Sequence, residues 1–314
     1  MSPTLPTSAR IREVGPRDGF QNEPEVISTS DKIALINQLA RTGLDRIEVA
    51  SFVRPDVIPQ LADALEVLNG IDVPDHVSLT VLVPNNRGLD NALTIRERFH
   101  EVAMFVSASE THNKRNVNRS IAESMSANEI VAKRIDAEDL RPTAVIATAF
   151  GCPFEGRVPM ERTLEIAEQF AAAGCAEIGF GDTTGMAHPA YVFDIFSAAL
   201  ERLPGVEITA HFHNTRGQGL ANAYAALQAG CTSFESSFGE LGGCPVPAGS
   251  TGNIATEDLA NMFEEMDVET GVNVRAVIDA ARAAQDVLGR KLTSHCIVAG
   301  PVDWLPNGTT EVCR

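Results

Sequence analysis

The chain has 314 residues, 44% of them hydrophobic, which is enough for one large domain or two small ones. Its formal net charge of −17 argues against a nucleic-acid-binding protein, and no apolar stretch approaches the ~18 residues of a membrane span. The six cysteines are scattered without a C-x-x-C pair, so we expect a reduced, cytoplasmic enzyme rather than a disulfide framework.

Short apolar segments alternate with helical patterns along the chain. Helix-like segments such as "TSDKIALINQLARTG" begin with capping hydroxyl residues and end at a glycine. This alternation predicts an α/β fold of the (β/α)8 TIM-barrel type. A doubly wound sheet is the alternative, but no G-x-G-x-x-G follows the first strand. The expected strands span residues 11–16, 46–52, 77–84, 101–109, 143–150, 175–183, 207–213 and 232–239.

We expect a single catalytic domain over residues 1–314. The barrel would occupy about 10–255, and additional C-terminal helices and a tail would occupy about 256–314. Cys152, Cys175 and Cys231 lie at strand borders and are expected to be buried as small apolar groups, whereas Cys296 and Cys313 fall in the C-terminal part.

Polar residues gather at the predicted strand ends. Active sites in this fold lie at the C-terminal ends of the strands. Strands also become polar simply where they meet water, but the charged members of this set are residue types that perform acid–base and metal chemistry. The set is Arg17, Asp18, Glu48, Asn85, Asn86, Ser107, Ser109, Thr148, Asp182, Thr183, His211, His213, Glu235 and Ser237.

The segment "AHFHN" is the most specific local signal. His211 and His213 are two residues apart in a strand and therefore share one face, which makes half of a metal site or a hydrogen-bonded histidine pair. The first and seventh strands flank the eighth in a closed barrel, so Asp18 can lie across from this pair. A glycine-rich loop after the eighth strand contains Cys244 and ends at Asn253. Oxygen and imidazole donors of this kind suit Mg²⁺ or Mn²⁺, with Zn²⁺ as the alternative.

Several motifs together resemble the 3-hydroxy-3-methylglutaryl-CoA lyases, within the superfamily of Claisen-type lyases and synthases that carry an Arg-Asp turn after strand 1. They are "EVGPRDGFQNE", "IEVASFV", "GCPFEG", "GDTTG", "HFHNTRGQGLAN" and "LGGCPVPAGSTGNIATEDL", and the similarity runs from about residue 10 to about residue 292. The resemblance implies a metal-dependent cleavage of a hydroxymethylglutaryl-type thioester to acetyl-CoA and a keto acid such as acetoacetate. It also implies a place in leucine degradation.

The resemblance assigns a role to individual positions. Its divalent-metal ligands fall on Asp18, His211, His213 and Asn253, and its catalytic residues on Arg17, Cys244, His211 and Glu48. Substrate-binding positions fall on Gln21, Asp182, Thr183 and Arg17, and a supporting acid falls on Glu257. In such chemistry the arginine stabilises charge that grows on the thioester oxygen. The cysteine or His211 would return a proton to the enolate carbon.

Some positions depart from the family pattern. Asn214 and Arg216 stand where Asp and Tyr are usual, and Glu240 stands at the base of the cysteine loop. None is a predicted ligand, so the lyase chemistry is retained, while the acyl group stays open: a citramalyl-CoA or a longer-branched glutaryl-CoA are alternatives. A Claisen condensation of acetyl-CoA with a 2-keto acid is a second class, and a barrel without turnover a third.

The expected partners are an acyl-CoA substrate and further copies of the chain, in a homodimer or higher homo-oligomer. The basic segment "NKRNVNRS" at 113–120 follows the fourth strand and would suit the phosphates of CoA.

Overall fold

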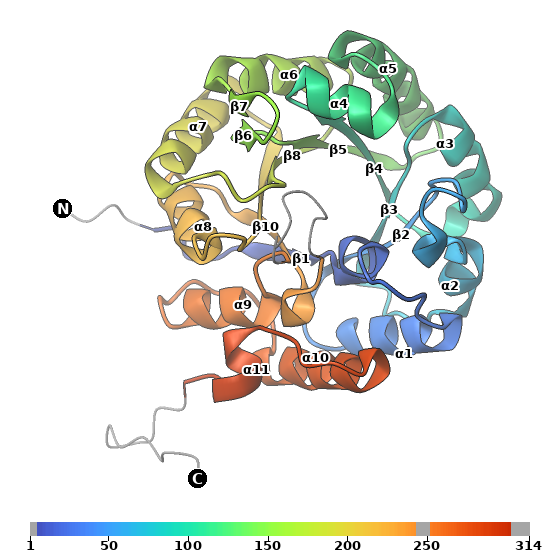
Figure 1. Ribbon diagram of the computed structural model, residues 1–314, viewed down its shortest axis with the longest axis vertical. Coiled ribbons are helices and arrows are strands. Elements are labelled where there is room, and N and C mark those ends of the chain that lie inside the picture. The colour runs from blue at the N-terminus through green and yellow to red at the C-terminus, as the bar shows by residue number, and fades with distance from the viewer. Residues whose placement is uncertain (1–4, 243–251, 303–314) are drawn as a thin grey trace.

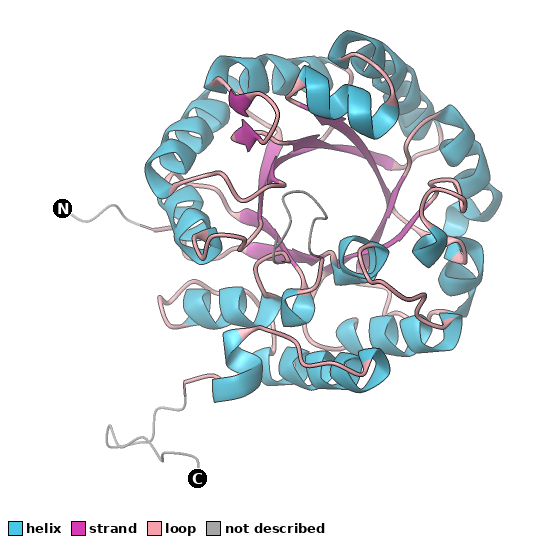
Figure 2. Cartoon of the chain, in the orientation of Figure 1, coloured by secondary structure: helices cyan, strands magenta, loops and turns pink. Residues whose placement is uncertain are grey.

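The barrel is closed and all of its strands are parallel. The computed structural model describes residues 5–242 and 252–302. The strand order around the barrel is β1-β10-β9-β8-β5-β4-β3-β2, so the TIM-barrel prediction is confirmed (Figures 1 and 2). The barrel strands are β1 (Arg10–Glu13), β2 (Arg46–Ser51), β3 (Ser78–Leu82), β4 (Glu101–Ser107), β5 (Arg141–Ala147), β8 (Glu177–Asp182), β9 (Glu207–Phe212) and β10 (Ser233–Ser236).

Helices surround the barrel on the outside (Figure 2). Local sequence fixes several of their ends: Ser120 and Glu123, for example, form a reciprocal capping box at the start of α5. The C-terminal helices α9 to α11 lie outside β1, where α10 packs against α1 (Figure 1). The helices are α1 (Thr29–Leu39), α2 (Ala64–Gly70), α3 (Asn86–Ala92), α4 (Glu110–Val117), α5 (Ile121–Ala137), α6 (Met160–Ala172), α7 (Pro189–Arg202), α8 (Gly219–Gln228), α9 (Thr256–Glu264), α10 (Val274–Leu288) and α11 (His295–Ala299).

The first strand is shorter than the sequence suggests. It ends at Glu13, and the next residues form one wide helical turn in which the Val14 carbonyl accepts from the amides of Arg17, Asp18 and Gly19 at 3.1, 2.7 and 3.4 Å. A glycine is required at position 15, because an added Cβ would lie 2.5 Å from the Phe238 ring. The turn replaces strand alternation, so neighbouring side chains can reach the same region.

One further element was not predicted. A small antiparallel hairpin, β6 (Gly151–Cys152) with β7 (Gly156–Arg157), follows β5 on the side of the strands' C-terminal ends. We call that end of the barrel the mouth. Glu155 in the hairpin accepts a hydrogen bond from the Thr111 amide at 2.6 Å, which ties the hairpin to the start of α4.

The core outside the strands is apolar, whereas the lumen is not. Phe180, Phe196 and Phe212 pack between strands and helices, fully buried. The predicted burial of Cys152, Cys175 and Cys231 is confirmed, and Cys296 is also buried; Cys313 lies outside the described residues. Among the described helices, none is both long and apolar enough to cross a membrane.

Inside the barrel, below the mouth, lies a set of charged residues that we call the lower ionic cluster. Aliphatic side chains usually fill this space in a TIM barrel. Here three arginines and three glutamates fill it, and every one of these carboxylates contacts a guanidinium. The members are Arg12, Arg46, Arg141, Glu101, Glu177 and Glu207.

Candidate active site

The Arg-Asp turn places both of its charges in the barrel mouth. Arg17 binds Glu48 of β2 through Nε at 2.7 Å and Nη2 at 2.6 Å, and it binds Asp18 Oδ1 through Nη1 at 2.6 Å. All three side chains are buried. Burial alone would lower the pKa of Arg17, but the two carboxylates outweigh it and raise that pKa. Arg17 is therefore a permanently charged cation in a buried site.

Three of the predicted metal ligands converge. Ligand atoms of Asp18, His211 and His213 all lie within 4.8 Å of one another, and the three residues are buried. The Nε2 atoms of the two histidines are 3.2 Å apart, so both rings turn the same edge toward one point. We call these three residues the mouth cluster. β10 lies between β1 and β9, as the closed-barrel reasoning requires.

Asn253 joins the cluster from the far end of the loop after β10. Its Nδ2 donates to Asp18 Oδ2 at 2.8 Å and to the Leu241 carbonyl at 3.1 Å, and its backbone pairs with that of His213. Its Oδ1 is buried and has no hydrogen-bond partner among the described residues. An orphaned carbonyl oxygen beside a carboxylate and two imidazoles is a donor set that Mg²⁺ or Mn²⁺ accepts. The residues thus fit a divalent cation.

A glutamate that the sequence did not assign holds His211. Glu235 Oε2 lies 2.9 Å from His211 Nδ1, and the sequence marked Glu235 only as polar at a strand end. Because Glu235 occupies Nδ1 of His211, the other ring nitrogen, Nε2, is directed toward His213 and the rest of the mouth cluster. Burial would raise the pKa of Asp18, but Arg17, His211 and His213 lower it, so the Asp18 carboxylate remains ionised.

The predicted substrate-binding residues lie around the cluster. Gln21 Nε2 donates to Asp18 Oδ1 at 3.3 Å. Asp182, at the end of β8 and level with Phe212, accepts from the Met186 and Ala187 amides through Oδ1 at 2.7 and 3.0 Å. Its Oδ2 is buried without a partner in the described part of the chain, and burial raises the pKa of Asp182 to about 7. Asp182 can thus hold or release a proton near neutral pH.

Thr183 has a more local role in the structure. Its Oγ1 accepts from the backbone amide of Thr148 at 3.1 Å, which joins the ends of β8 and β5. Thr148 has a φ of +55°, a region that β-branched residues rarely adopt. The contact fixes an unusual strand end at the mouth.

Two buried glutamates brace the loops from behind. Glu257 accepts from the Gly239 amide at 3.1 Å and from Ser294 Oγ, and its supporting role stays a prediction. Glu13 accepts from the Gly15 amide at 2.7 Å, from the Phe238 amide at 3.1 Å and from Thr256 Oγ1 at 2.7 Å. Burial raises the pKa of Glu13 to about 8 and that of Glu257 to about 7.

Glu13 was missed in the sequence. Its contacts span more than two hundred positions, from Glu13 to Phe238 and Thr256, and no local pattern reveals them. The only signal was an acidic residue directly before the turn.

The residues that depart from the family pattern also brace loops. Arg216 Nη1 donates to the Thr184 and Gly185 carbonyls at 2.9 and 2.7 Å. Glu240 Oε1 accepts from Asn214 Nδ2 at 2.6 Å. Cys244 lies outside the described residues, so its predicted place near the site stays a prediction.

The basic segment after β4 is mostly helical. Residues 113–117 belong to α4, which ends at Asn118 in a left-handed conformation. The Arg115 guanidinium lies 4.0 Å from the centre of the Phe154 ring, on the β6–β7 hairpin. A cation and a half-exposed aromatic ring therefore lie together on the mouth side of the barrel.

Comparison with known proteins agrees with this geometry. The family model described as HMGL-like matches residues 8–284. The chain is 47% identical over 290 residues to the hydroxymethylglutaryl-CoA lyase YngG of Bacillus subtilis, covering 92% of this chain and 96% of that protein. It is 39% identical to a Pseudomonas aeruginosa protein named 3-hydroxy-3-isohexenylglutaryl-CoA/hydroxymethylglutaryl-CoA lyase, covering 94% and 98%.

A solved structure shares the fold closely. The structure of an HMG-CoA lyase from Acinetobacter baumannii, in complex with coenzyme A and 3-methylmalate, superposes with a TM-score of 0.90 at 37% identity, covering 98% of each chain.

Proposed function

This chain belongs to the HMGL-like family and is a carbon–carbon lyase, and from that premise we propose that it cleaves 3-hydroxy-3-methylglutaryl-CoA to acetyl-CoA and acetoacetate with a divalent cation. The observation that carries the proposal is the mouth cluster of Asp18, His211 and His213 beside the buried Arg17. The relatives support the lyase class, and the donor set supports the metal.

Asp18, His211, His213 and Asn253 would hold the cation. When bound, a divalent cation lowers the pKa of the substrate hydroxyl and orients the substrate. The donor atoms come from three places in the chain, namely the turn after β1, the end of β9 with the residue that follows it, and the segment before α9. Because each is held by hydrogen bonds within the protein, the site is organised before substrate arrives.

Arg17 would stabilise the developing enolate. Cleavage removes the hydroxyl proton, breaks the bond between the hydroxyl carbon and the carbon next to the thioester, and returns a proton to that carbon. Negative charge moves onto the thioester oxygen as the bond breaks. Glu48 fixes the guanidinium through two nitrogens, so Arg17 presents its remaining N–H groups without reorganisation.

The returning proton needs a carrier, and we assign it to Cys244 with His211 as the alternative. Cys244 belongs to the segment between β10 and Asn253, nine positions before Asn253 in the sequence. His211 serves less well if its Nε2 binds the cation. Asp182, with a raised pKa and one unpartnered oxygen, together with Gln21 and Thr183, would contact the polar groups of the acyl chain.

The CoA part of the bound substrate would extend from the barrel mouth toward the basic helix α4. Arg115 on Phe154, with Lys114 on the same helix, supplies cations and an aromatic surface for the CoA nucleotide. The Pseudomonas relative is named for two acyl groups, which supports a longer-branched glutaryl-CoA as a second substrate. We further propose that residues 1–314 form one catalytic domain and that the chain forms a homo-oligomer.

A panel assay tests the proposal. Acetyl-CoA release is followed for 3-hydroxy-3-methylglutaryl-CoA, a citramalyl-CoA and an isohexenylglutaryl analogue, each with Mg²⁺ and with EDTA. We expect release from the first that EDTA abolishes and Mg²⁺ restores. Consumption of acetyl-CoA with a 2-keto acid would instead identify a condensing enzyme, and release that is unaffected by EDTA would contradict the metal requirement.

A further inference from the structure

We propose that Glu235 is a positioning residue for the metal site, which fixes the His211 ring through Nδ1 while Arg12 fixes Glu235. This inference rests on the proposed function, because it concerns the cation that the mouth cluster would hold. It adds two residues, neither of them a ligand, to the machinery of the site.

The first contact orients the ring. His211 Nδ1 lies 2.9 Å from Glu235 Oε2, and the two residues are level on neighbouring strands β9 and β10. A neutral imidazole that donates from Nδ1 leaves the Nε2 lone pair for another partner. That Nε2 faces His213 Nε2 at 3.2 Å, inside the mouth cluster. Glu235 therefore selects both the tautomer and the direction of the ring.

The second contact holds the glutamate. Arg12 Nη1 donates to Glu235 Oε1 at 2.8 Å, so the two oxygens of one carboxylate have different partners. Glu235 cannot turn to favour one partner without weakening its bond to the other. Both Arg12 and Glu235 are buried, and water does not compete for these contacts.

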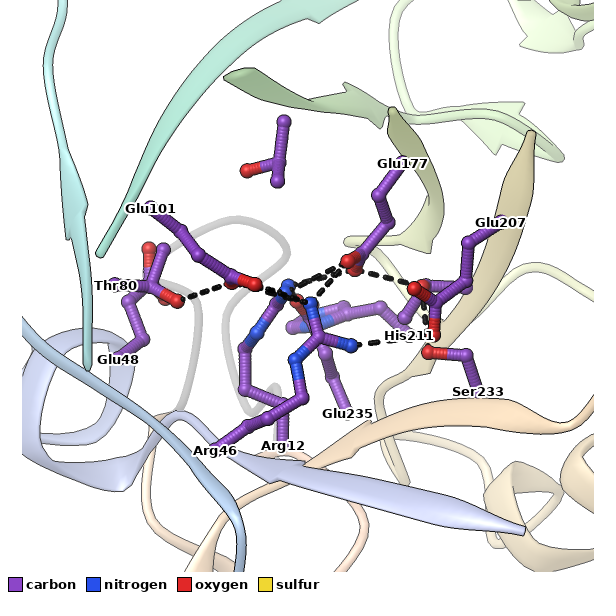
Figure 3. A network of polar contacts seen from close by, with 12 residues as sticks. Arg12, Arg46, Glu48, Thr80, Glu101, Glu177, Glu207, His211, Ser233 and Glu235 are labelled. Atoms are coloured by element: carbon purple, nitrogen blue, oxygen red, sulfur yellow. Dashed lines mark hydrogen bonds and ion pairs between the residues drawn. The ribbon is translucent and has the colours of Figure 1, made fainter. Parts of the chain in front are cut away.

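The third contact joins Arg12 to two other members of the lower ionic cluster. Its Nη2 donates to Glu101 and to Glu177, both at 2.9 Å. Figure 3 shows the guanidinium groups of Arg12 and Arg46 surrounded by carboxylates, with Glu235 between Arg12 and His211. The chain of contacts thus runs from the paired charges in the lumen to the ring at the mouth.

The experiment compares two identical substitutions. Glu235→Gln and Glu101→Gln each remove one buried carboxylate that accepts from Arg12, and both residues are 4% exposed. Only Glu235 contacts His211. A glutamine at 235 has one acceptor oxygen for two donors, so either the His211 or the Arg12 contact is lost. The readout is the Mn²⁺ dissociation constant without substrate, measured by electron paramagnetic resonance of free Mn²⁺.

We expect Glu235→Gln to weaken Mn²⁺ binding by about 10- to 100-fold, the usual effect of a lost outer-shell partner. Glu101→Gln should stay within about 3-fold of wild type. Equal losses in both variants, or unchanged affinity in Glu235→Gln, would overturn the positioning role. If the wild-type chain binds no Mn²⁺, the metal-dependent function fails first, and this inference fails with it.

A second measurement uses the unaltered chain and holds even if Glu235→Gln does not fold. Long-range ¹H–¹⁵N NMR of the Mg²⁺-loaded protein reports which His211 nitrogen carries the proton, with the resonance assigned from a His211→Asn spectrum. We expect the proton on Nδ1. A proton on Nε2 would show that Glu235 does not set the ring and would overturn the inference.

Discussion

The lower ionic cluster and the mouth cluster both consist of polar and charged side chains inside the barrel, but these side chains are paired in different ways. In the lumen, Arg46 and Arg141 form ion pairs with Glu101, Glu177 and Glu207, so the charges neutralise one another. At the mouth, a carboxylate, two imidazoles and an amide oxygen converge beside the guanidinium of Arg17. Carboxylates that are matched by guanidinium groups stabilise the fold. Donor atoms that converge without enough neighbouring positive charge can instead bind an added cation.

This comparison predicts that a substitution in the lower ionic cluster lowers the stability of the fold. In Arg46→Met, Glu101 and Glu177 lose a partner in a buried site, and we expect the free energy of unfolding to fall by about 3–5 kcal/mol. Urea unfolding measures the change. Arg134→Met is the control, because its partner Asp90 is exposed and such pairs contribute about 0–1 kcal/mol. Equal effects would remove the distinction between the buried and exposed pairs.

Damage at the mouth should instead appear in turnover. Arg17→Gln removes the cation that we propose stabilises the enolate oxygen, and we expect kcat to fall by about 10²–10³-fold, or roughly 3–4 kcal/mol. Mn²⁺ should still bind, because Arg17 would not be a ligand; its contact with Asp18 is that of an outer-shell partner, whose loss weakens metal binding by at most about 100-fold. Steady-state kinetics with parallel Mn²⁺ titration separates the two effects. Near-normal turnover would take Arg17 out of the mechanism.

Glu13 belongs to neither cluster, because it contacts Gly15, Phe238 and Thr256, and its effect on stability should depend on pH. Burial raises the pKa of Glu13 in the folded chain to about 8, from an ordinary value of 4.5, so between these pH values the folded chain retains a proton that the unfolded chain releases. That stabilisation is complete below pH about 4.5 and is lost as pH rises toward 8, by at most about 1.4 kcal/mol per pH unit.

Glu13→Gln tests the sign. The amide oxygen can still accept from Gly15 and Phe238, and the amide N–H can face Thr256 Oγ1, so the fold should survive. Urea midpoints from pH 5 to 8 should fall more steeply for wild type than for the variant. Parallel curves would show that Glu13 is ionised throughout.

The sequence predicted those features that are written locally. Strand positions follow from apolar segments, and the carboxyl ends of parallel strands meet at one end of a barrel, which brought Asp18, His211 and His213 together in advance. Their partners could not be read the same way. Glu235 contacts Arg12 from 223 positions away, and that pairing exists only because β1 and β10 close the barrel in one register.

The helical turn after Glu13 shows a second limit. The strand predicted over residues 11–16 ends at Glu13, and the type of turn that follows it depends on the Phe238 ring packed against Gly15. The contact between Phe238 and Gly15 forms only in the folded chain, so the sequence of the turn alone does not reveal it. The β6–β7 hairpin, with two residues in each strand, is likewise too short for a periodic pattern.

The most direct test of the central claim is a Mn²⁺ titration of wild type and Asp18→Ala, with Asp90→Ala as an exposed control. Asp18 is the one carboxylate in the mouth cluster, so its loss should weaken Mn²⁺ binding by more than the ~10²-fold ceiling for an outer-shell residue. We predict one tight equivalent of Mn²⁺ in wild type and in Asp90→Ala, and none in Asp18→Ala. Unchanged tight binding in Asp18→Ala would contradict the account.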